Sequence, residues 1–159
     1  SCLWFFSLSI CNAQTPDSSK YSALSFEIGK TGLIYNISFD RKLPGKNFGY
    51  RINMGSNFAK YLSVFTTGVG GYYLLGQKKK YFELGIDLSY FVVTEISDDQ
   101  RGFADIFIYP DYPIKTFYAS MNVGYRKYGN RSLFRIGISP GFNKTEFLPG
   151  GYISYGFIL

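Results

Sequence analysis

The feature that most constrains this chain is a strict alternation of apolar and other residues in segment 82–90. The segment reads Phe-Glu-Leu-Gly-Ile-Asp-Leu-Ser-Tyr, so that every second side chain is large and apolar. Successive side chains of a β-strand point to opposite faces, and this period therefore gives a strand with one apolar and one polar face. A helix would scatter the same side chains around its circumference. Segment 82–90 is therefore predicted to be a β-strand.

Similar alternation recurs along the chain and predicts eight strands in total. The other seven segments are 24–29, 33–40, 48–55, 61–75, 117–126, 134–139 and 152–159. The break at Lys30-Thr31 is short, and the pattern leaves open whether the segments on either side of it are two strands or one. Aromatic residues, which favour β-strands, make up 20% of the chain. After residue 13 the chain contains no run of 18 uncharged apolar residues, so the sequence predicts no membrane-spanning helix.

The short turns predict how neighbouring strands pair. Placing each turn at its Gly, Pro or Lys residues keeps the apolar residues of both strands on one face, as pairing requires. The expected cross-strand pairs are Phe26 with Tyr35, Asp40 with Gly49, Leu75 with Phe82, and Tyr125 with Phe134. In this register Arg51 lies diagonal to Asp40, within reach of an ion pair.

The connections alternate in length in a way that is typical of outer-membrane β-barrels. Turns 43–46, 76–81 and 129–130 are short, whereas the connections at about 94–115 and 140–150 are long. Such barrels have an even number of strands, short periplasmic turns, long outer loops and a lipid-facing apolar band. We therefore predict an all-β fold, an eight-stranded antiparallel up-and-down transmembrane β-barrel.

The chain resembles the small eight-stranded outer-membrane β-barrels of Gram-negative bacteria, the OmpA/OmpX-like group within the porin-like barrels. The resemblance covers nearly all of the chain after residue 13 and is carried by segments 32–41, 72–76, 82–85 and 150–159. It implies that the protein lies in the outer membrane and contacts its lipid. It also implies that the barrel-insertion machinery reads the C-terminal strand, where Tyr155 and Phe157 are in phase with Leu159.

The sizes of the side chains indicate which face of the sheet is outside. An eight-stranded barrel has an interior just wide enough for side chains, and a Phe or Tyr at nearly every other inward position would overfill it. The polar face therefore lines the lumen, where we expect a structural network of paired charges, because buried charges need partners. Its members are Glu27, Asp40, Arg51, Glu83, Asp87, Arg126 and Arg135.

The two ends of the predicted barrel differ in charge. The basic residues at the short turns are Arg41, Lys42, Lys46, Lys78, Lys79, Lys80, Arg126, Lys127 and Arg131. The long connection after the fifth strand carries acids together with aromatic side chains, and we take it as a candidate partner-binding outer loop. The residues chosen for it are Asp98, Asp99, Phe103, Asp105, Phe107 and Tyr109.

The first residues are predicted to lie outside the barrel. Residues 1–13 contain an uncharged apolar run and end in small or polar residues, which is the pattern of a secretory signal peptide whose start is missing. A buried N-terminal strand and lipid modification at Cys11 are the two alternatives. We expect residues 14–19 to form a short tail and residues 20–159 to form one barrel domain.

The chain contains no histidine, which excludes His-dependent hydrolysis and the usual zinc and haem sites. We expect no cofactor, no metal, no catalysis and no nucleic acid, and a monomer that binds a surface protein or glycan. Two alternatives remain. One is a soluble lipocalin-like barrel that carries a small apolar ligand, and the other is a narrow pore.

Overall fold

Antiparallel strands account for most of the chain that the structure describes. The computed structural model describes residues 21–30, 35–56, 62–95, 115–144 and 147–159. Within these ranges the strands are β1 (Tyr21–Ile28), β2 (Tyr35–Lys42), β3 (Phe48–Ser56), β4 (Leu62–Gln77), β5 (Lys80–Glu95), β6 (Lys115–Tyr128), β7 (Ser132–Ile138), β8 (Gly141–Phe142), β9 (Phe147–Leu148) and β10 (Gly151–Ile158).

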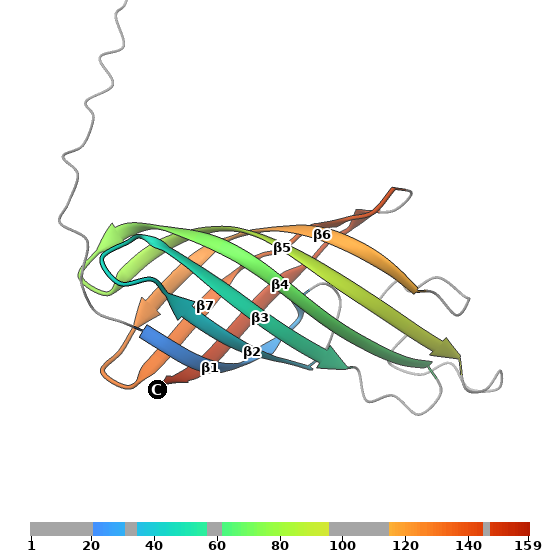
Figure 1. The fold of residues 1–159 in the computed structure, drawn as a ribbon, viewed down its shortest axis with the longest axis horizontal. Coiled ribbons are helices and arrows are strands. Elements are labelled where there is room, and N and C mark those ends of the chain that lie inside the picture. Colours follow the sequence, from blue (N-terminus) through green and yellow to red (C-terminus); the bar gives the residue numbers. More distant parts are fainter. Residues whose placement is uncertain (1–20, 31–34, 57–61, 96–114, 145–146) are drawn as a thin grey trace, which may run out of the picture.

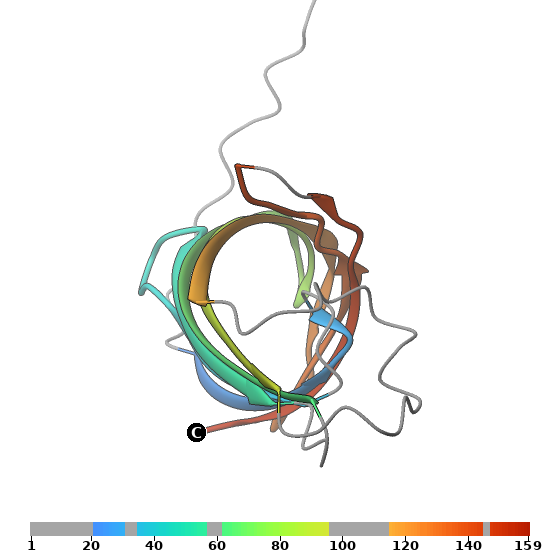
Figure 2. The same cartoon turned by 90° about the vertical axis from the view of Figure 1, so that its right-hand side faces the viewer.

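Eight of these strands close into a barrel (Figures 1 and 2). Each of β1 to β6 pairs with the next strand, β7 also pairs with β10, and β10 pairs with β1. The segments on either side of residues 30–31 form β1 and β2, which pair as two separate antiparallel strands. The predicted eight-stranded antiparallel barrel is confirmed.

The connection after β7 contains a small hairpin that the alternation did not predict. Strands β8 and β9 pair with each other, and β8 also pairs with β6, with Ala119 opposite Phe142. Between the β6–β7 pairing and the β6–β8 pairing, the amide of Met121 donates to the carbonyl of Pro140 over 3.1 Å. Two-residue strands are too short to show a period in the sequence.

The predicted registers are right in one hairpin and wrong by two residues in three. Leu75 lies opposite Phe82 as predicted. The observed partners elsewhere are Phe26 with Ile37, Asp40 with Arg51, and Tyr125 with Ile136. In each of these three hairpins the turn is centred one residue later than predicted. Because a shift of two residues leaves every side chain on its own face, the assignment of inside and outside survives the error.

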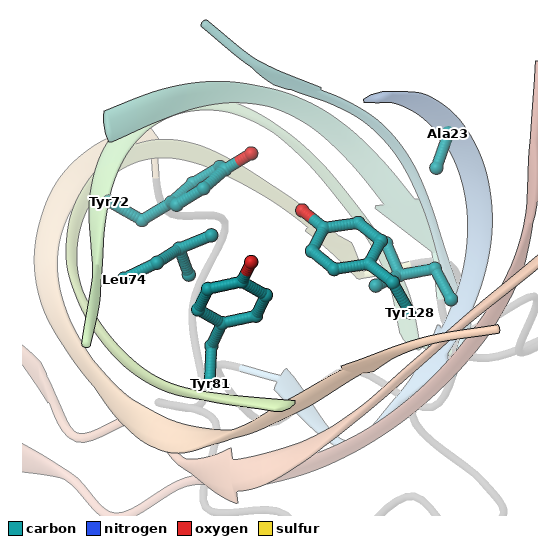
Figure 3. Packing of buried hydrophobic residues seen from close by; sticks show 6 residues of the cluster. Ala23, Tyr72, Leu74, Tyr81 and Tyr128 are labelled. Carbon is teal, nitrogen blue, oxygen red and sulfur yellow. The ribbon is translucent and has the colours of Figure 1, made fainter. Parts of the chain in front are cut away.

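Each end of the lumen carries its own cluster of buried apolar residues. At the end where β4 turns into β5 and β6 into β7, which we call the turn end, the cluster consists of Ala23, Tyr72, Leu74, Tyr81, Tyr128 and Leu133. The labelled tyrosines of this cluster point toward the interior (Figure 3). At the opposite, loop end, a second cluster consists of Val64, Phe91, Val93 and Tyr118.

The outer face carries the apolar side chains of the alternating pattern. Ile86 is 65% exposed, Phe117 61% and Phe157 63%. Other exposed apolar residues occur on all eight barrel strands, including Leu24, Ile37, Ile52, Val69, Leu88, Met121, Ile136 and Ile153. The barrel is therefore apolar outside and polar inside, the reverse of a water-soluble protein.

Several sequence predictions concern residues outside the described ranges. These are the signal peptide at 1–13, the tail at 14–19 and the outer-loop residues Asp98, Asp99, Phe103, Asp105, Phe107 and Tyr109. Among the residues that are described, no helix combines the length and the hydropathy needed to cross a bilayer.

Candidate functional site: a charge network in the lumen

The seven charged residues assigned to the lumen from the sequence all point inward and lie close together. Each occupies an inward position of β1, β2, β3, β5, β6 or β7, and none is more than 1% exposed. The alternation placed them on the inner face, but their mutual distances depend on how the strands stagger around the barrel, which the sequence does not show.

Glu83 on β5 is the centre of the network because it accepts hydrogen bonds from three arginines. Arg126 Nε donates to its Oε2 over 2.6 Å. Arg135 donates to both of its oxygens, from Nε over 3.2 Å and from Nη2 over 3.2 Å. Arg51 donates through Nη2 to Oε1. One carboxylate therefore holds together side chains from β3, β6 and β7.

Asp40 on β2 binds two of these three arginines, Arg51 and Arg126. Arg126 grips it with two parallel hydrogen bonds, from Nη1 over 2.9 Å and from Nη2 over 2.7 Å, the fork geometry that suits a guanidinium. Arg51 Nε donates to it over 3.3 Å, and the Tyr72 hydroxyl donates over 2.5 Å. The sequence prediction placed Arg51 diagonal to Asp40, but the two are direct cross-strand partners because of the shifted turn.

Lys30 completes the network and was missed by the sequence reasoning. Its ammonium donates to Asp87 and lies 4.0 Å from Glu27, although it follows the end of β1. Asp87 also accepts from Asn122 over 2.9 Å, and Glu27 accepts from Arg135 over 3.1 Å. The predicted set held four acids and three arginines. This imbalance was the one signal that a further cation was needed.

Aromatic side chains that the sequence reasoning did not single out pack against the arginines. The guanidinium of Arg126 lies 4.0 Å from the ring centroid of Tyr72, and that of Arg135 lies 4.9 Å from the ring of Tyr152. Such cation–π contacts stabilise arginines away from water. Lys42, expected at an exposed rim, is instead fully buried, with its ammonium 5.8 Å from the ring of Tyr21.

This arrangement can hold strands together more readily than it can carry out acid–base chemistry. Each of the four carboxylates makes an ion pair with at least one cation, and the four carboxylates are matched by Lys30, Arg51, Arg126 and Arg135. A group of three or more metal-ligating side chains is not found among the described residues.

Gly70 on β4 provides space for the network, and this gives a testable prediction. A Cβ at this position would collide with the Asp87 carboxylate, because Gly70 lies directly opposite both Arg51 and Asp87. We expect Gly70→Ala to destabilise the barrel by about 1–3 kcal/mol through this overpacking, measured by urea unfolding. Gly71→Ala is the matched control, since its Cβ would face outward beside the Phe48 ring. Equal losses in the two variants would contradict this role for Gly70.

Comparisons with known proteins identify the fold. No protein-family model and no curated protein sequence matches the chain. Among solved structures, the N-terminal β-barrel domain of Pseudomonas aeruginosa OprF aligns with a TM-score of 0.64 at 10% identity, covering 90% of this chain and 98% of that domain. Neisserial surface protein A aligns with a TM-score of 0.49 at 10% identity, covering 88% of this chain and 93% of the other. The chain thus has the eight-stranded barrel fold of the OprF N-terminal domain.

Proposed function

We propose that this protein is an integral outer-membrane β-barrel with a structural or surface-interaction role. One observation supports the proposal above all others: the outer face is apolar on all eight barrel strands, whereas Glu27, Asp40, Glu83 and Asp87 are buried in the lumen. An apolar surface of this extent is costly in water and favourable in lipid. The fold shared with a barrel domain of OprF adds to this argument.

The same arrangement of charge argues for a closed scaffold. The charged side chains of the network are ion-paired across strands, and Arg51, Arg126 and Arg135 are each no more than 1% exposed. A lipocalin-like carrier needs an apolar cavity for its ligand and a polar outer face, which is the opposite distribution. A narrow pore would require these ion pairs to separate.

The turn end then faces the periplasm and the loop end faces the cell exterior, as in barrels of this architecture. Any interaction at the cell surface would therefore be made by the loop end, where residues 96–114 connect β5 to β6. We propose that a surface protein or glycan binds there, and that the barrel-insertion machinery contacts β10.

Membrane insertion is tested by refolding the full chain into phospholipid vesicles. We expect the barrel to resist extraction with alkaline carbonate and to migrate differently on gels before and after heating, because a closed barrel stays folded in detergent. Planar-bilayer recordings of the same sample are expected to show no steady conductance. Quantitative recovery in the soluble fraction would contradict the proposal, and steady single-channel currents would favour the pore.

A further inference from the structure

Five basic residues gather at the turn end of the barrel on two turns that contact each other. We call Lys78, Lys79, Lys80, Lys127 and Arg131 the basic turn cluster; all five are exposed. The amide of Tyr128 donates to the carbonyl of Lys79 over 2.8 Å, and the Lys79 ammonium donates to Asn130 Oδ1 over 3.2 Å. The turn between β4 and β5 is thereby fixed against the turn between β6 and β7.

The backbone of the first turn is unfavourable for lysine. Lys78 and Lys79 form the two-residue loop between Gln77 and Lys80, with φ of 51° and 71°. Turns with positive φ at both positions strongly prefer Asn-Gly, because larger side chains are strained there. Two lysines at these positions lower the stability of the hairpin, and a role for their charge would account for their presence.

The pairing of Lys80 with Lys127 brings two like charges together. They are direct cross-strand partners on the outer face of β5 and β6. Like charges in this position destabilise a sheet, with Cβ atoms about 5 Å apart. Among the described side chains, every carboxylate lies in the lumen, so none is available to separate the two ammonium groups.

The lumen shows how this protein accommodates such a pair. Arg126 and Arg135 are also direct cross-strand partners, and the Glu83 carboxylate accepts hydrogen bonds from both. An anion is therefore the group that stabilises two opposed cations inside the barrel. No carboxylate among the described side chains does this for the exposed lysine pair, and an external anion would stabilise the two ammonium groups in the same way.

The neighbouring side chains indicate where that anion comes from. One step further along the outer face, Phe82 lies opposite Tyr125, and both are exposed. Leu84 and Val123 follow in the same ladder. Aromatic residues mark the interface between lipid tails and headgroups, and lysines just beyond them lie at the depth of the phosphates.

We propose that the basic turn cluster binds the phosphate of an anionic phospholipid in the leaflet at the turn end. The ammonium groups of Lys80 and Lys127 contact the phosphate, and Phe82 and Tyr125 contact its acyl chains. Lys78, Lys79 and Arg131 add to the attraction for negative charge. This inference rests on the membrane insertion proposed above.

The test measures which lipid the protein retains. The full chain, folded in a non-ionic detergent, receives equal amounts of phosphatidylglycerol and phosphatidylethanolamine with identical acyl chains, and bound lipid is counted by native mass spectrometry. We expect preferential retention of phosphatidylglycerol that falls by about fivefold for each cluster lysine removed. Added salt should reduce the preference, because it screens exposed charges.

Two paired variants separate a binding defect from a folding defect. Lys78→Asn combined with Lys79→Gly installs the residues preferred by the turn, and we expect it to fold at least as stably while losing preference for phosphatidylglycerol. Lys80→Gln combined with Lys127→Gln removes the opposed pair, and this variant should also lose the preference for phosphatidylglycerol. Lys115→Gln combined with Lys144→Gln is the matched control. It removes two exposed cations at the loop end and should keep the preference for phosphatidylglycerol.

Several results would overturn the inference. They are equal retention of both lipids by the unmodified protein, an unchanged preference in both turn-end variants, or tighter binding of a polyglutamate peptide than of phosphatidylglycerol, which would indicate an acidic protein partner. The vesicle experiment above is independent. A barrel that inserts but shows no lipid preference refutes only this inference, whereas a barrel that fails to insert refutes the proposed function.

Discussion

Replacing Glu83 by Gln is expected to cost the barrel about 3–5 kcal/mol of stability, the range for breaking a buried ion pair from one side. Glu83 accepts hydrogen bonds from Arg51, Arg126 and Arg135, and all four side chains are buried. Glutamine has almost the same shape but carries no charge, and its amide presents a donor to the arginines. The loss of stability is measured by incubating the protein in vesicles at increasing urea concentrations. The fraction that remains folded is then read from unheated gels.

A second substitution distinguishes charge imbalance from a loss of packing. Arg135→Gln in the Glu83→Gln background restores equal numbers of cations and anions within the ion-paired network. We expect the double variant to be less destabilised than the sum of its two single variants, because the uncompensated positive charge is gone. Strict additivity, or a loss below about 0.5 kcal/mol for Glu83→Gln alone, would contradict the role of Glu83 as the centre of the network.

The alternation in the sequence was sufficient to sort the side chains onto two faces, because a strand repeats every two residues. The sizes of the side chains then indicated which face is outside. Three turn centres were misplaced by one residue, yet all seven residues chosen for the lumen face inward, since the resulting shift of two residues keeps each side chain on its face. The consequence was local. Arg51 and Asp40 were expected to lie diagonally, and they are direct partners.

Lys30 shows the limit of the same reasoning. It follows the end of β1, where the period no longer applies, and its ammonium reaches back to Asp87 on the fifth strand. The contacts of Glu83 with three arginines were equally out of reach, because they form across the lumen and depend on the stagger of the strands. Which side chains meet across the lumen depends on how the strands close into a barrel. Which face of the sheet a side chain occupies depends only on its position within its own strand.

Replacing Ile86 by Lys should distinguish a membrane barrel from a water-soluble one. Ile86 is 65% exposed and lies near the middle of the outer face of β5, opposite Met121. In a bilayer a lysine at the midplane destabilises a barrel by about 2–4 kcal/mol. On a protein surface in water the same change lies within about 0.5 kcal/mol of neutral. Urea unfolding in vesicles measures the difference.

In a bilayer, the destabilisation caused by a lysine depends on its depth in the membrane. Leu75→Lys is therefore the matched control for Ile86→Lys. Leu75 also faces outward, but it lies only two residues before Gln77, at the turn between β4 and β5. A lysine there extends to the headgroups, and we expect a loss of about 0–1 kcal/mol. A soluble barrel has no such gradient, because water surrounds both positions equally. If the two lysine variants were equally stable, the outer face of this barrel would not be in contact with lipid.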